Sequence, residues 1–371
     1  MASTGLLKID LTAIVDNWAL LCAYVEQNGS GVECGAVVKA NAYGLGVAPV
    51  AKALQLAGCR RFFVATLDEG VELRLAIGEG ASVVVFGGLA HGLCDKWCLH
   101  QLTPVLFDSA HIELWLAYCR AKGAKLPCVL KVDTGMHRLG ILPEQFAGVL
   151  SSQEVAEQLQ PEMLMSHLAC ADECAHSLNE IQLKRFESTA QQVKTLYPSI
   201  ELSLSNSSGV FLGESFHFDV CRPGAALYGI NPTPHESNPM QSVISLSLPV
   251  MQVRTIVRGE PVGYGATFVA PREMRLATVF GGYADGLLRL ISGRGYGWCS
   301  GLKVPIVGRV SMDSIIFDVT DVVGALDCIE VLNGSQGVDD LARYGSTIGY
   351  EVLTSLGARY RREYIHQQVD L

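Results

Sequence analysis

The sequence predicts an α/β protein in two parts: an N-terminal (β/α)8 barrel, residues 1–235, and a mostly-β C-terminal domain, residues 236–371. Three observations support this fold class. Short apolar runs alternate with amphipathic segments through the first two thirds of the chain, at intervals of about 20 to 35 residues. Beyond Asn231 the chain is instead rich in β-type runs. At roughly 150 residues per domain, a chain of 371 residues is also long enough for two domains.

Eight short runs are predicted as the barrel strands. Their apolar residues are continuous rather than alternating, which is typical of parallel strands that are buried on both faces. A doubly wound open sheet stays the alternative, because the spacing of strands along the chain does not show whether a sheet closes. The eight runs are Gly35–Lys39, Phe62–Thr66, Ser82–Phe86, Pro104–Phe107, Cys128–Val132, Met163–His167, Leu202–Asn206 and Ala225–Tyr228.

Amphipathic stretches between these runs are predicted as helices. Thr66, followed by Glu69, and Ser109 are typical helix starts, and the glycines at 58, 78 and 123 are typical helix stops. The predicted helices are Val47–Ala57, Leu67–Ile77, Ser109–Lys122, Pro143–Leu159 and Leu178–Tyr197.

The segment NPTPHESNPMQ, which begins at Asn231, is rich in proline and polar residues and indicates a domain boundary. Two helices are predicted near the C-terminus, Val338–Tyr344 and Glu351–Leu356. The predicted strands of this domain are Ser245–Val257, Arg275–Phe280, Val304–Val307 and Ser314–Val319.

Composition excludes several classes of protein. The net charge of −9 disfavours a nucleic-acid partner, because an acidic surface repels phosphates. No uncharged apolar run approaches about 18 residues, so we expect no transmembrane helix, and the N-terminus does not resemble a secretory signal. The 12 cysteines form no CxxC pair, and we interpret them as free thiols in a reducing cytoplasm, with no metal site.

Polar residues are concentrated where the predicted strands end. Active sites of (β/α)8 barrels lie at the C-terminal ends of the strands, so these residues are candidates for the site. They are Lys39, Lys131 with Arg138, His167, Asn206 with Ser207, and Arg222 with Tyr228.

Lys39 is the most informative of these residues. It follows the apolar run AVV, and desolvation at the mouth of a barrel lowers the pKa of a lysine, which favours a neutral amine suited to Schiff-base chemistry. For one lysine alone, a side chain that extends to solvent is the commoner situation. The context KANAYG, with an aromatic hydroxyl and a glycine nearby, favours the functional interpretation.

The segment VVKANAYGLG resembles the pyridoxal phosphate (PLP) attachment motif of alanine racemases. Similar segments follow in the family's order and cover nearly the whole chain: KVDTGMHRLG, MSHLA, SNSSG, CRPGAALYG, VGYGATFVA, GGYADGLLR, VGRVSMD and TIGYEV. The resemblance implies a barrel followed by a β-rich domain, PLP as cofactor, a homodimer with shared active sites, and interconversion of L- and D-alanine. It also implies a role in supplying D-alanine for peptidoglycan, with degradation of D-alanine left open.

The resemblance implies two catalytic bases. Lys39 would hold the cofactor and act on one face of the substrate, and Tyr264 would reach the other face from the partner subunit. Racemisation needs a proton removed from one face of the α-carbon and returned to the other, so two opposed bases suit it. The phenol of an isolated tyrosine titrates at about pH 10; His167 resembles the histidine that hydrogen-bonds the tyrosine. Without the resemblance, Tyr264 would be interpreted as an aromatic residue at the rim of the site, and His167 as a hydrogen-bonded histidine of the core.

The resemblance also implies a cofactor site. Arg222 would donate to the pyridine nitrogen, and since a guanidinium keeps its proton, the ring would remain a weaker electron sink. Taken alone, this arginine would be a salt-bridge residue and SNSSG an ordinary loop with a helix cap. Many relatives support the arginine with a histidine where this chain has Ser203, which leaves that support in question. Cofactor and phosphate contacts are implied for Tyr43, Asn206, Ser207, Gly224, Ala225 and Tyr350.

Around the substrate, Arg138 matches the arginine that meets the carboxylate, and Lys131 matches a lysine that is often carboxylated. Met312 and Asp313 resemble residues that the partner subunit places beside the substrate, and Tyr283 resembles a tyrosine at the entrance.

Three other functions stay open: a non-catalytic PLP carrier, a decarboxylase of the same fold class, and a racemase of broader specificity or one for serine. The β-rich domain with Tyr264 argues against the carrier.

Overall fold

The computed structural model describes residues 4–28 and 31–366. They form two compact units. The barrel unit contains Ile14–Ala42 and Gly46–Met240. Of the described residues, the C-terminal unit contains residues 4–13, 43–45 and 241–366. Each unit has its own sheet and its own core.

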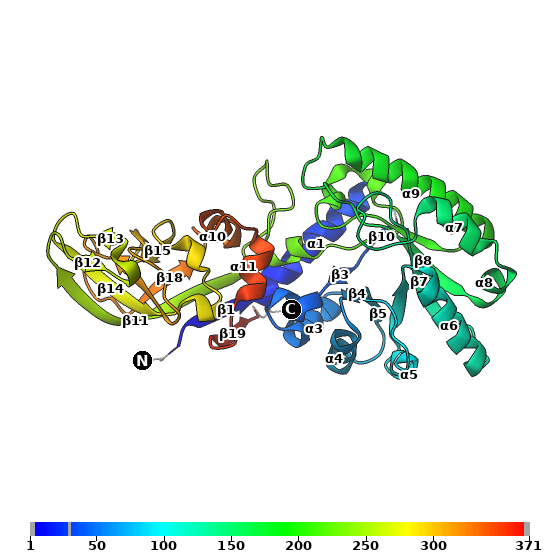
Figure 1. Cartoon of the computed structure of the whole chain (residues 1–371), viewed down its shortest axis with the longest axis horizontal. Coiled ribbons are helices and arrows are strands. Elements are labelled where there is room, and N and C mark those ends of the chain that lie inside the picture. Colours follow the sequence, from blue (N-terminus) through cyan, green and yellow to red (C-terminus); the bar gives the residue numbers. More distant parts are fainter. Residues whose placement is uncertain (1–3, 29–30, 367–371) are drawn as a thin grey trace, which may run out of the picture. The chain divides into compact units, whose positions relative to one another are not determined.

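Seven parallel strands form the main sheet of the barrel unit, in the order in which they occur along the chain (Figure 1). All of them are short and largely buried, in agreement with the continuous apolar runs in the sequence. They are β3 (Ala36–Val37), β4 (Arg61–Val64), β5 (Ser82–Val85), β6 (Thr103–Leu106), β7 (Pro127–Lys131), β8 (Gln160–Met165) and β9 (Glu201–Ser203).

An eighth strand closes the barrel. β10 (Val220–Cys221) pairs in parallel with β2 (Glu33–Cys34). β2 and β3 follow each other along the chain and together serve as the first strand of the barrel. On the other side of β10, Asp219 N–H donates to Leu202 O at 3.0 Å and Arg222 N–H to Ser205 O at 2.9 Å, which joins β10 to the end of β9. Hydrogen bonds therefore run around the whole ring, which confirms the barrel and excludes the open sheet.

The predicted eighth strand, Ala225–Tyr228, is wrong. This segment is a short 3-10 helix, and the strand lies a few residues earlier, at β10. All four residues of the helix are buried, so its apolar run has the same appearance in the sequence as a strand buried on both faces. The Ser207 hydroxyl accepts hydrogen bonds from Gly224 N–H and Ala226 N–H, which stabilises the turn.

Most predicted helices of the barrel unit are confirmed to within one residue. Thr66 forms a capping box with Glu69 at the start of α4, and Gly78 and Gly123 cap the ends of α4 and α6. The predicted helix Pro143–Leu159 is two helices, because Ser152 caps a new start. Two helices were not predicted, α1 (Leu11–Asn28) and α5 (Cys94–Leu99). The others are α3 (Val47–Leu56), α4 (Leu67–Ile77), α6 (Ser109–Lys122), α7 (Pro143–Leu150), α8 (Gln153–Gln158) and α9 (Ser177–Leu196).

The C-terminal unit is built on an eight-stranded, mainly antiparallel sheet. The N-terminal strand β1 (Leu6–Asp10) lies in this sheet between β11 and β19, although it precedes the barrel in sequence. The predicted strand Val304–Val307 is displaced by two residues. The other strands are β11 (Ile244–Ile256), β14 (Met274–Phe280), β15 (Tyr296–Cys299), β16 (Leu302–Pro305), β17 (Ser314–Asp318), β18 (Cys328–Leu332) and β19 (Arg361–Ile365). The predicted helices correspond to α10 (Val338–Tyr344) and α11 (Gly349–Ser355).

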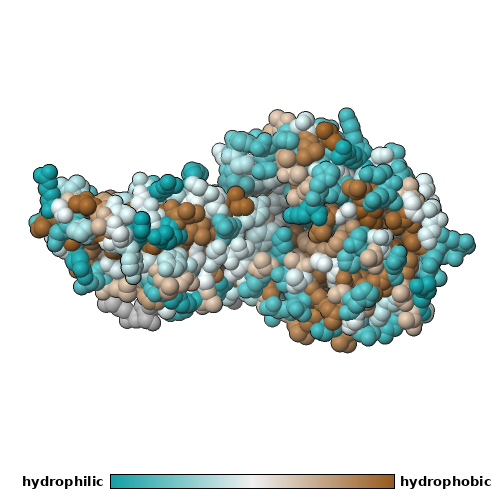
Figure 2. Space-filling view, viewed as in Figure 1, coloured by the Kyte–Doolittle hydropathy of each residue, from teal (hydrophilic) through white to brown (hydrophobic). Residues whose placement is uncertain are grey.

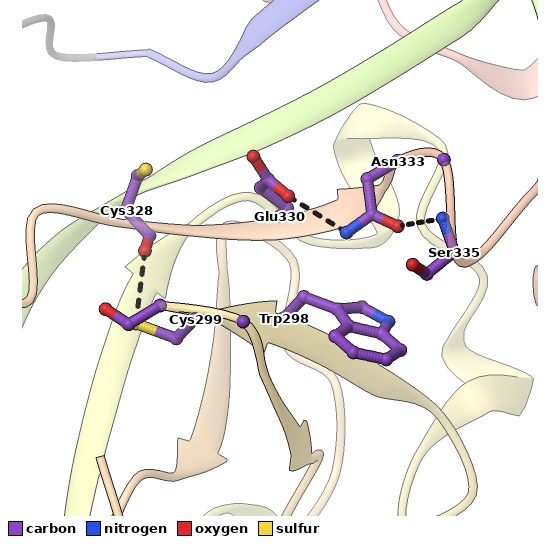
Figure 3. A pocket seen from close by; sticks show the side chains of 9 residues that line it. Trp298, Cys299, Cys328, Glu330, Asn333 and Ser335 are labelled. Carbon is purple, nitrogen blue, oxygen red and sulfur yellow. Dashed lines mark hydrogen bonds between the residues drawn. The ribbon is translucent and has the colours of Figure 1, made fainter. Parts of the chain in front are cut away.

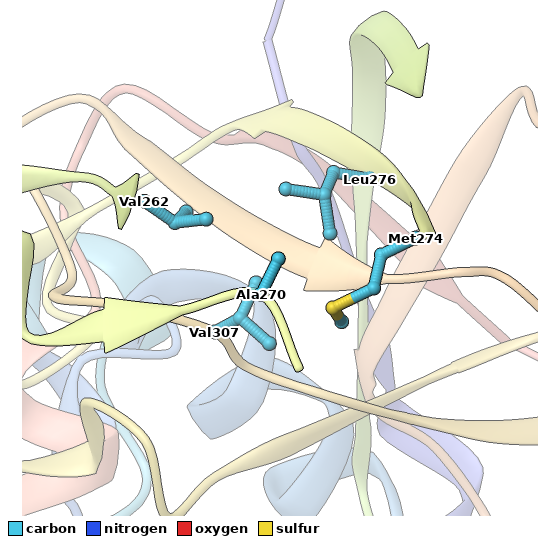
Figure 4. Close-up of a cluster of buried hydrophobic side chains, with 5 residues drawn as sticks. All are labelled: Val262, Ala270, Met274, Leu276 and Val307. Carbon is cyan, nitrogen blue, oxygen red and sulfur yellow. The ribbon is translucent and has the colours of Figure 1, made fainter. Parts of the chain in front are cut away.

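A small hydrophobic cluster anchors the ribbon of β12 (Pro261–Val262) and β13 (Phe268–Val269) to this sheet (Figure 4). Its members are at most 5% exposed, and they come from the ribbon, from β14 and from the segment after β16. The loop between β12 and β13 carries Tyr264, so the cluster holds both ends of that loop. The cluster consists of Val262, Ala270, Met274, Leu276 and Val307.

No helix in the described ranges has the length and apolar character needed to cross a membrane. The face of the molecule seen in Figure 2 shows polar side chains interspersed among apolar ones over both units. All twelve cysteines are free thiols, as predicted.

Candidate active site

A cluster of positive side chains lies at the C-terminal ends of the barrel strands. Burial, Arg222 and Arg138 lower the pKa of Lys131 to about 8, and burial and Arg138 lower the pKa of Lys39. Burial, followed by Arg222 and Lys131, holds the pKa of His167 well below its usual range, so its imidazole is neutral. These mutual effects show that Lys39, Lys131, Arg138, His167 and Arg222, predicted from four different strand ends, lie close to one another.

Lys39 begins an unusual backbone turn. Ala40, Asn41 and Ala42 all have left-handed backbone angles, with φ between 52° and 55°, and Ala42 N–H closes the turn on Val38 O at 2.9 Å. A left-handed conformation costs about 1–2 kcal/mol for each residue that is not glycine. Sequence reasoning did not find this turn, because the segment has no glycine before position 44.

Contacts around the turn offset its strain. Ala40 N–H donates to Glu69 Oε1 at 2.8 Å, and the other oxygen of Glu69 accepts Ala65 N–H at 2.6 Å. Asn41 Oδ1 accepts Val47 N–H at 2.7 Å, at the start of α3. The surrounding structure thus imposes the turn and fixes the backbone from which the Lys39 side chain projects.

Replacing Ala40 with glycine is expected to raise the free energy of unfolding by about 1 kcal/mol, because glycine adopts this conformation without steric cost. Ala117, exposed in the interior of α6, is the matched control. There the same substitution should lower the free energy of unfolding by about 1 kcal/mol. Denaturant unfolding of both variants measures the two changes, and a destabilised Ala40→Gly protein would show that the turn is not strained.

Arg138 is brought toward Lys131 by the loop that follows β7. The carboxylate of Asp133 accepts backbone N–H bonds from four residues, which include Gly135 at 2.8 Å and Arg138 at 3.2 Å. Burial acts to raise the pKa of Asp133, but these donors hold it below its usual value. Gly140 completes the loop, since a Cβ there would lie 2.5 Å from Asp133 N. Sequence reasoning missed Asp133, although the Asp-Thr-Gly triplet is a recognisable turn signal.

Arg222 is buried and held in one orientation. Its Nη2 donates to Ser166 O at 2.5 Å and to Leu204 O at 3.4 Å, and its Nη1 donates to the hydroxyl of Ser203. Ser203 in turn donates to Val220 O at 2.5 Å. A serine at position 203 therefore supports the arginine directly. Burial lowers the pKa of Arg222 to about 10, so the guanidinium is protonated at neutral pH.

The ends of β9 and β10 form a group of unpaired backbone donors. Ser207, Ser208 and Ala225 are buried, and within the described residues no acceptor lies in reach of their N–H groups. Asn206 stabilises the turn by accepting Gly209 N–H at 2.9 Å. Buried N–H groups without partners are costly, and converging N–H groups are a common anion site. These donors fit an anionic group such as a phosphate.

The remaining predicted residues belong to the C-terminal unit. Tyr264 is 71% exposed and lies between Gly263 and Gly265, whose positive φ angles of 69° and 72° turn the loop outward. Tyr283 and Met312 are also exposed. Tyr43 and Tyr350 contact each other in this unit, with ring centroids 6.1 Å apart, and burial and Tyr350 raise the pKa of Tyr43. Tyr264, Tyr283 and Tyr350 are therefore exposed on this unit, whereas Tyr43 is buried.

A separate cavity lies between β15 and β18 in the C-terminal unit (Figure 3). It contains none of the predicted site residues. Its polar side chains are largely engaged with one another: Asn333 Nδ2 donates to Glu330 at 2.9 Å and Cys299 donates to Cys328 O at 3.6 Å. Burial raises the pKa of both thiols, so they are poor nucleophiles. In the described part of the chain, no group of three or more metal-binding side chains is suitably placed.

These features are those of a (β/α)8-barrel enzyme with a desolvated lysine and an anion site at the strand ends, followed by a β domain that carries exposed tyrosines. Comparison with known families agrees. The sequence pattern of "Alanine racemase, N-terminal domain" matches residues 9–232, and that of "Alanine racemase, C-terminal domain" matches residues 243–364. The chain belongs to the alanine racemase family.

Individual relatives are similar over almost their whole length. The chain is 44% identical over 368 residues to "Alanine racemase, catabolic" of Mesorhizobium japonicum, covering 98% of this chain and 94% of the relative. It is equally identical to "Alanine racemase" of Rhodospirillum rubrum, covering 98% and 96%. Among solved structures, the alanine racemase of Bartonella henselae with covalently bound pyridoxal phosphate superimposes with a TM-score of 0.92 at 38% identity, over 98% of this chain and 100% of that one.

Proposed function

We propose that this protein interconverts L- and D-alanine with PLP as cofactor, by a two-base mechanism in a homodimer. The observation that carries the proposal is the desolvated Lys39 amine beside Arg138, Lys131 and Arg222, next to buried N–H groups without acceptors. This set of groups requires an anion and offers an amine with a lowered pKa. PLP has a phosphate for the N–H groups and an aldehyde for the amine.

The residues have distinct roles in the proposal. Lys39 and Tyr43 hold the cofactor, the segments at Asn206–Ser207 and Gly224–Ala225 bind its phosphate with Tyr350, and Arg222 donates to its ring nitrogen. When bound, PLP supplies an electron-withdrawing ring that weakens the Cα–H bond of the substrate. Because the pKa of Arg222 remains about 10, the guanidinium keeps its proton and acts only as a donor.

The chain's own groups move the protons. The lowered pKa of Lys39 raises the fraction of neutral amine, which accepts the α-proton on one face of the substrate. Tyr264 of the partner subunit acts on the opposite face, and the neutral imidazole of His167 is its hydrogen-bond partner. Arg138 binds the substrate carboxylate, while Met312, Asp313 and Tyr283 of the partner subunit line the side on which substrate enters.

Lys131 is proposed to be carboxylated on its amine. The reaction consumes a neutral amine and CO2 and releases a proton, and a lysine pKa of about 8 makes that neutral amine available near neutral pH. The carbamate would add a negative charge between Arg138 and Arg222, which relieves the repulsion among the cations. Extra electron density on Lys131 Nζ in a crystal structure supports the modification, and a bare ammonium contradicts it.

Chiral chromatography of separate L-amino acids, incubated with the PLP-loaded protein, tests the function. Alanine should reach a near-equal mixture of enantiomers, with other amino acids much slower. Comparable conversion of many amino acids, serine among them, would support racemisation but contradict specificity for alanine. No conversion of any amino acid would contradict the racemase and favour a carrier or a decarboxylase, which released CO2 would distinguish.

Mixing Lys39→Ala and Tyr264→Ala proteins tests the shared sites. If each site takes Lys39 from one subunit and Tyr264 from the other, a hybrid dimer has one intact site, and random exchange should restore up to about a quarter of wild-type activity. Each variant alone is the control. No recovery after subunit exchange, verified by native mass spectrometry, would contradict the shared-site homodimer.

The proposed physiological role is cytoplasmic supply of D-alanine for peptidoglycan. Several curated relatives are instead named "Alanine racemase, catabolic", which makes breakdown of D-alanine the second candidate. Deleting the gene in its host distinguishes them. A requirement for added D-alanine supports the biosynthetic role, and loss of growth only on D-alanine as carbon source supports the catabolic one.

The domain boundary at 235/236 also stays a proposal, supported by family matches that end at 232 and begin at 243.

A further inference from the structure

Two loops of the C-terminal unit lie side by side and are hydrogen-bonded to each other. They are residues 281–285, which follow β14, and residues 311–313, which precede β17; these strands pair antiparallel, so the loops emerge at the same end. Tyr283 N–H donates to Ser311 O at 3.1 Å. Gly282 is required at this contact, because a Cβ there would lie 2.2 Å from Ser311 O. The two loops therefore cannot shift independently without breaking backbone contacts.

One arginine joins the side chains of the two loops. Arg359 lies between α11 and β19, and its Nε and Nη2 donate to the two carboxylate oxygens of Asp285, each at 2.7 Å. Its Nη1 donates to Asp313 Oδ1, also at 2.7 Å. Bidentate contacts between a guanidinium and a carboxylate are strong and directional. A single guanidinium thus holds one carboxylate in each loop.

The Asp285 end of this bridge is rigid. Asp285 is 1% exposed, and its carboxylate also accepts Gly282 N–H at 3.0 Å. The backbone of the arginine's own segment is fixed to the same residue, since Gly357 N–H donates to Asp285 O at 3.1 Å. The guanidinium carbon lies 5.6 Å from the centre of the Phe280 ring. These contacts set the plane of the guanidinium and hence the direction in which its Nη1 group points toward Asp313.

The Asp313 end depends on Arg359. The Asp313 side chain is 51% exposed, and within residues 4–28 and 31–366 Arg359 is the one hydrogen-bond donor to its carboxylate. An exposed carboxylate without a fixed partner samples several rotamers. Arg359 therefore selects the orientation of Asp313 and, through it, of the loop that carries Met312.

We propose that Arg359 is a positioning residue of the racemase: acting through Asp313, it holds the 311–313 loop in the geometry that accepts alanine in the partner's site. The inference rests on the proposed function, in which Met312 and Asp313 lie beside the substrate. Arg359 itself does not take part in proton transfer. Its loss should consequently raise KM for alanine more than it lowers kcat.

A double-mutant cycle tests the proposal. Arg359→Gln and Asp313→Asn should each raise KM about tenfold, which corresponds to about 1.4 kcal/mol. The double variant should raise it no further, because each change by itself already breaks the contact between Arg359 and Asp313. Arg272→Gln is the matched control, since Arg272 pairs with Asp318 at 3.5 Å in the same unit, and its KM should be unchanged. An unchanged KM in Arg359→Gln, or strictly additive effects, would overturn the proposal.

Arg359→Lys separates positioning from stability. A lysine keeps a positive charge beside buried Asp285 but lacks the planar fork that holds both carboxylates. It should restore the Tm lost in Arg359→Gln without restoring KM. Hydrogen exchange gives a readout that does not need activity: the amides of Tyr283 and Ala284, bonded to Ser311 O and Met312 O, should exchange faster in Arg359→Lys.

The outcomes are distinguishable. A folded Arg359→Lys protein with wild-type KM, or with unchanged exchange at both amides, would overturn the positioning role even if Arg359→Gln does not fold. A wild-type protein without racemase activity would instead contradict the proposed function. In that case the hydrogen-exchange comparison still decides whether Arg359 holds the loop.

Discussion

Replacing Lys39 with arginine should abolish alanine racemisation, with a loss of about 10⁴-fold or more. Arginine keeps its proton at any ordinary pH, so it supplies neither a nucleophile for the aldehyde of PLP nor a base for the α-proton. In the wild type, burial and Arg138 lower the pKa of Lys39, which increases the neutral amine that both tasks need. The measurement is the initial rate of enantiomer conversion with saturating PLP.

Lys52→Arg on α3 is the matched control, because this lysine is exposed and distant from the strand ends; its activity should be unchanged. Borohydride reduction and peptide mapping add an independent test. PLP should be recovered on the peptide that contains residue 39 in the wild type and on no peptide in Lys39→Arg. Substantial racemisation by Lys39→Arg, or PLP attached to another lysine, would refute the assignment of Lys39.

Replacing Tyr264 with phenylalanine should lower kcat by about 10²- to 10⁴-fold, the range typical for loss of a general base. The equilibrium constant between two enantiomers is fixed, so kcat/KM must fall equally for L- and D-alanine. Because Tyr264 is 71% exposed, the free energy of unfolding should change by no more than about 0.5 kcal/mol. Tyr118→Phe on α6, far from the strand ends, is the control for activity.

Solvent exchange in D2O shows which face is affected. In Tyr264→Phe, Lys39 can still exchange the α-proton of the enantiomer that presents it to that side. One enantiomer should therefore incorporate deuterium much faster than the other, whereas the wild type exchanges both. Equal slow exchange of both enantiomers would indicate that Tyr264 is not the base of one particular face.

Much of the fold could be predicted from local sequence. The helix α4 has the predicted bounds because Thr66 and Glu69 form a capping box and Gly78 ends it. The first seven barrel strands lie at or near their predicted positions, because strands buried on both faces need continuous apolar runs. The eighth was misplaced, since the buried 3-10 helix Ala225–Tyr228 has the same apolar character as a strand.

The site residues were only partly predictable from the sequence. Lys39, Lys131, His167 and Arg222 could be selected because parallel barrel strands bring their C-terminal ends to one edge. Asp133, Ser166 and Arg359 were not selected, because each acts through hydrogen bonds to residues distant in sequence or to the backbone of a loop. No local pattern marks an arginine whose partners lie 74 and 46 positions away.

Most element types, the strand-end residues and the family could be inferred from the sequence alone, because helix caps, apolar periodicity and long motifs are local properties of the chain. Closure of the barrel through β10 and the place of β1 in the C-terminal sheet became evident only in the folded structure, since both depend on pairing between distant segments. The folded structure also sets the pKa values of the buried cations and the left-handed turn after Lys39, which depend on burial and on neighbours that the chain brings together only when folded.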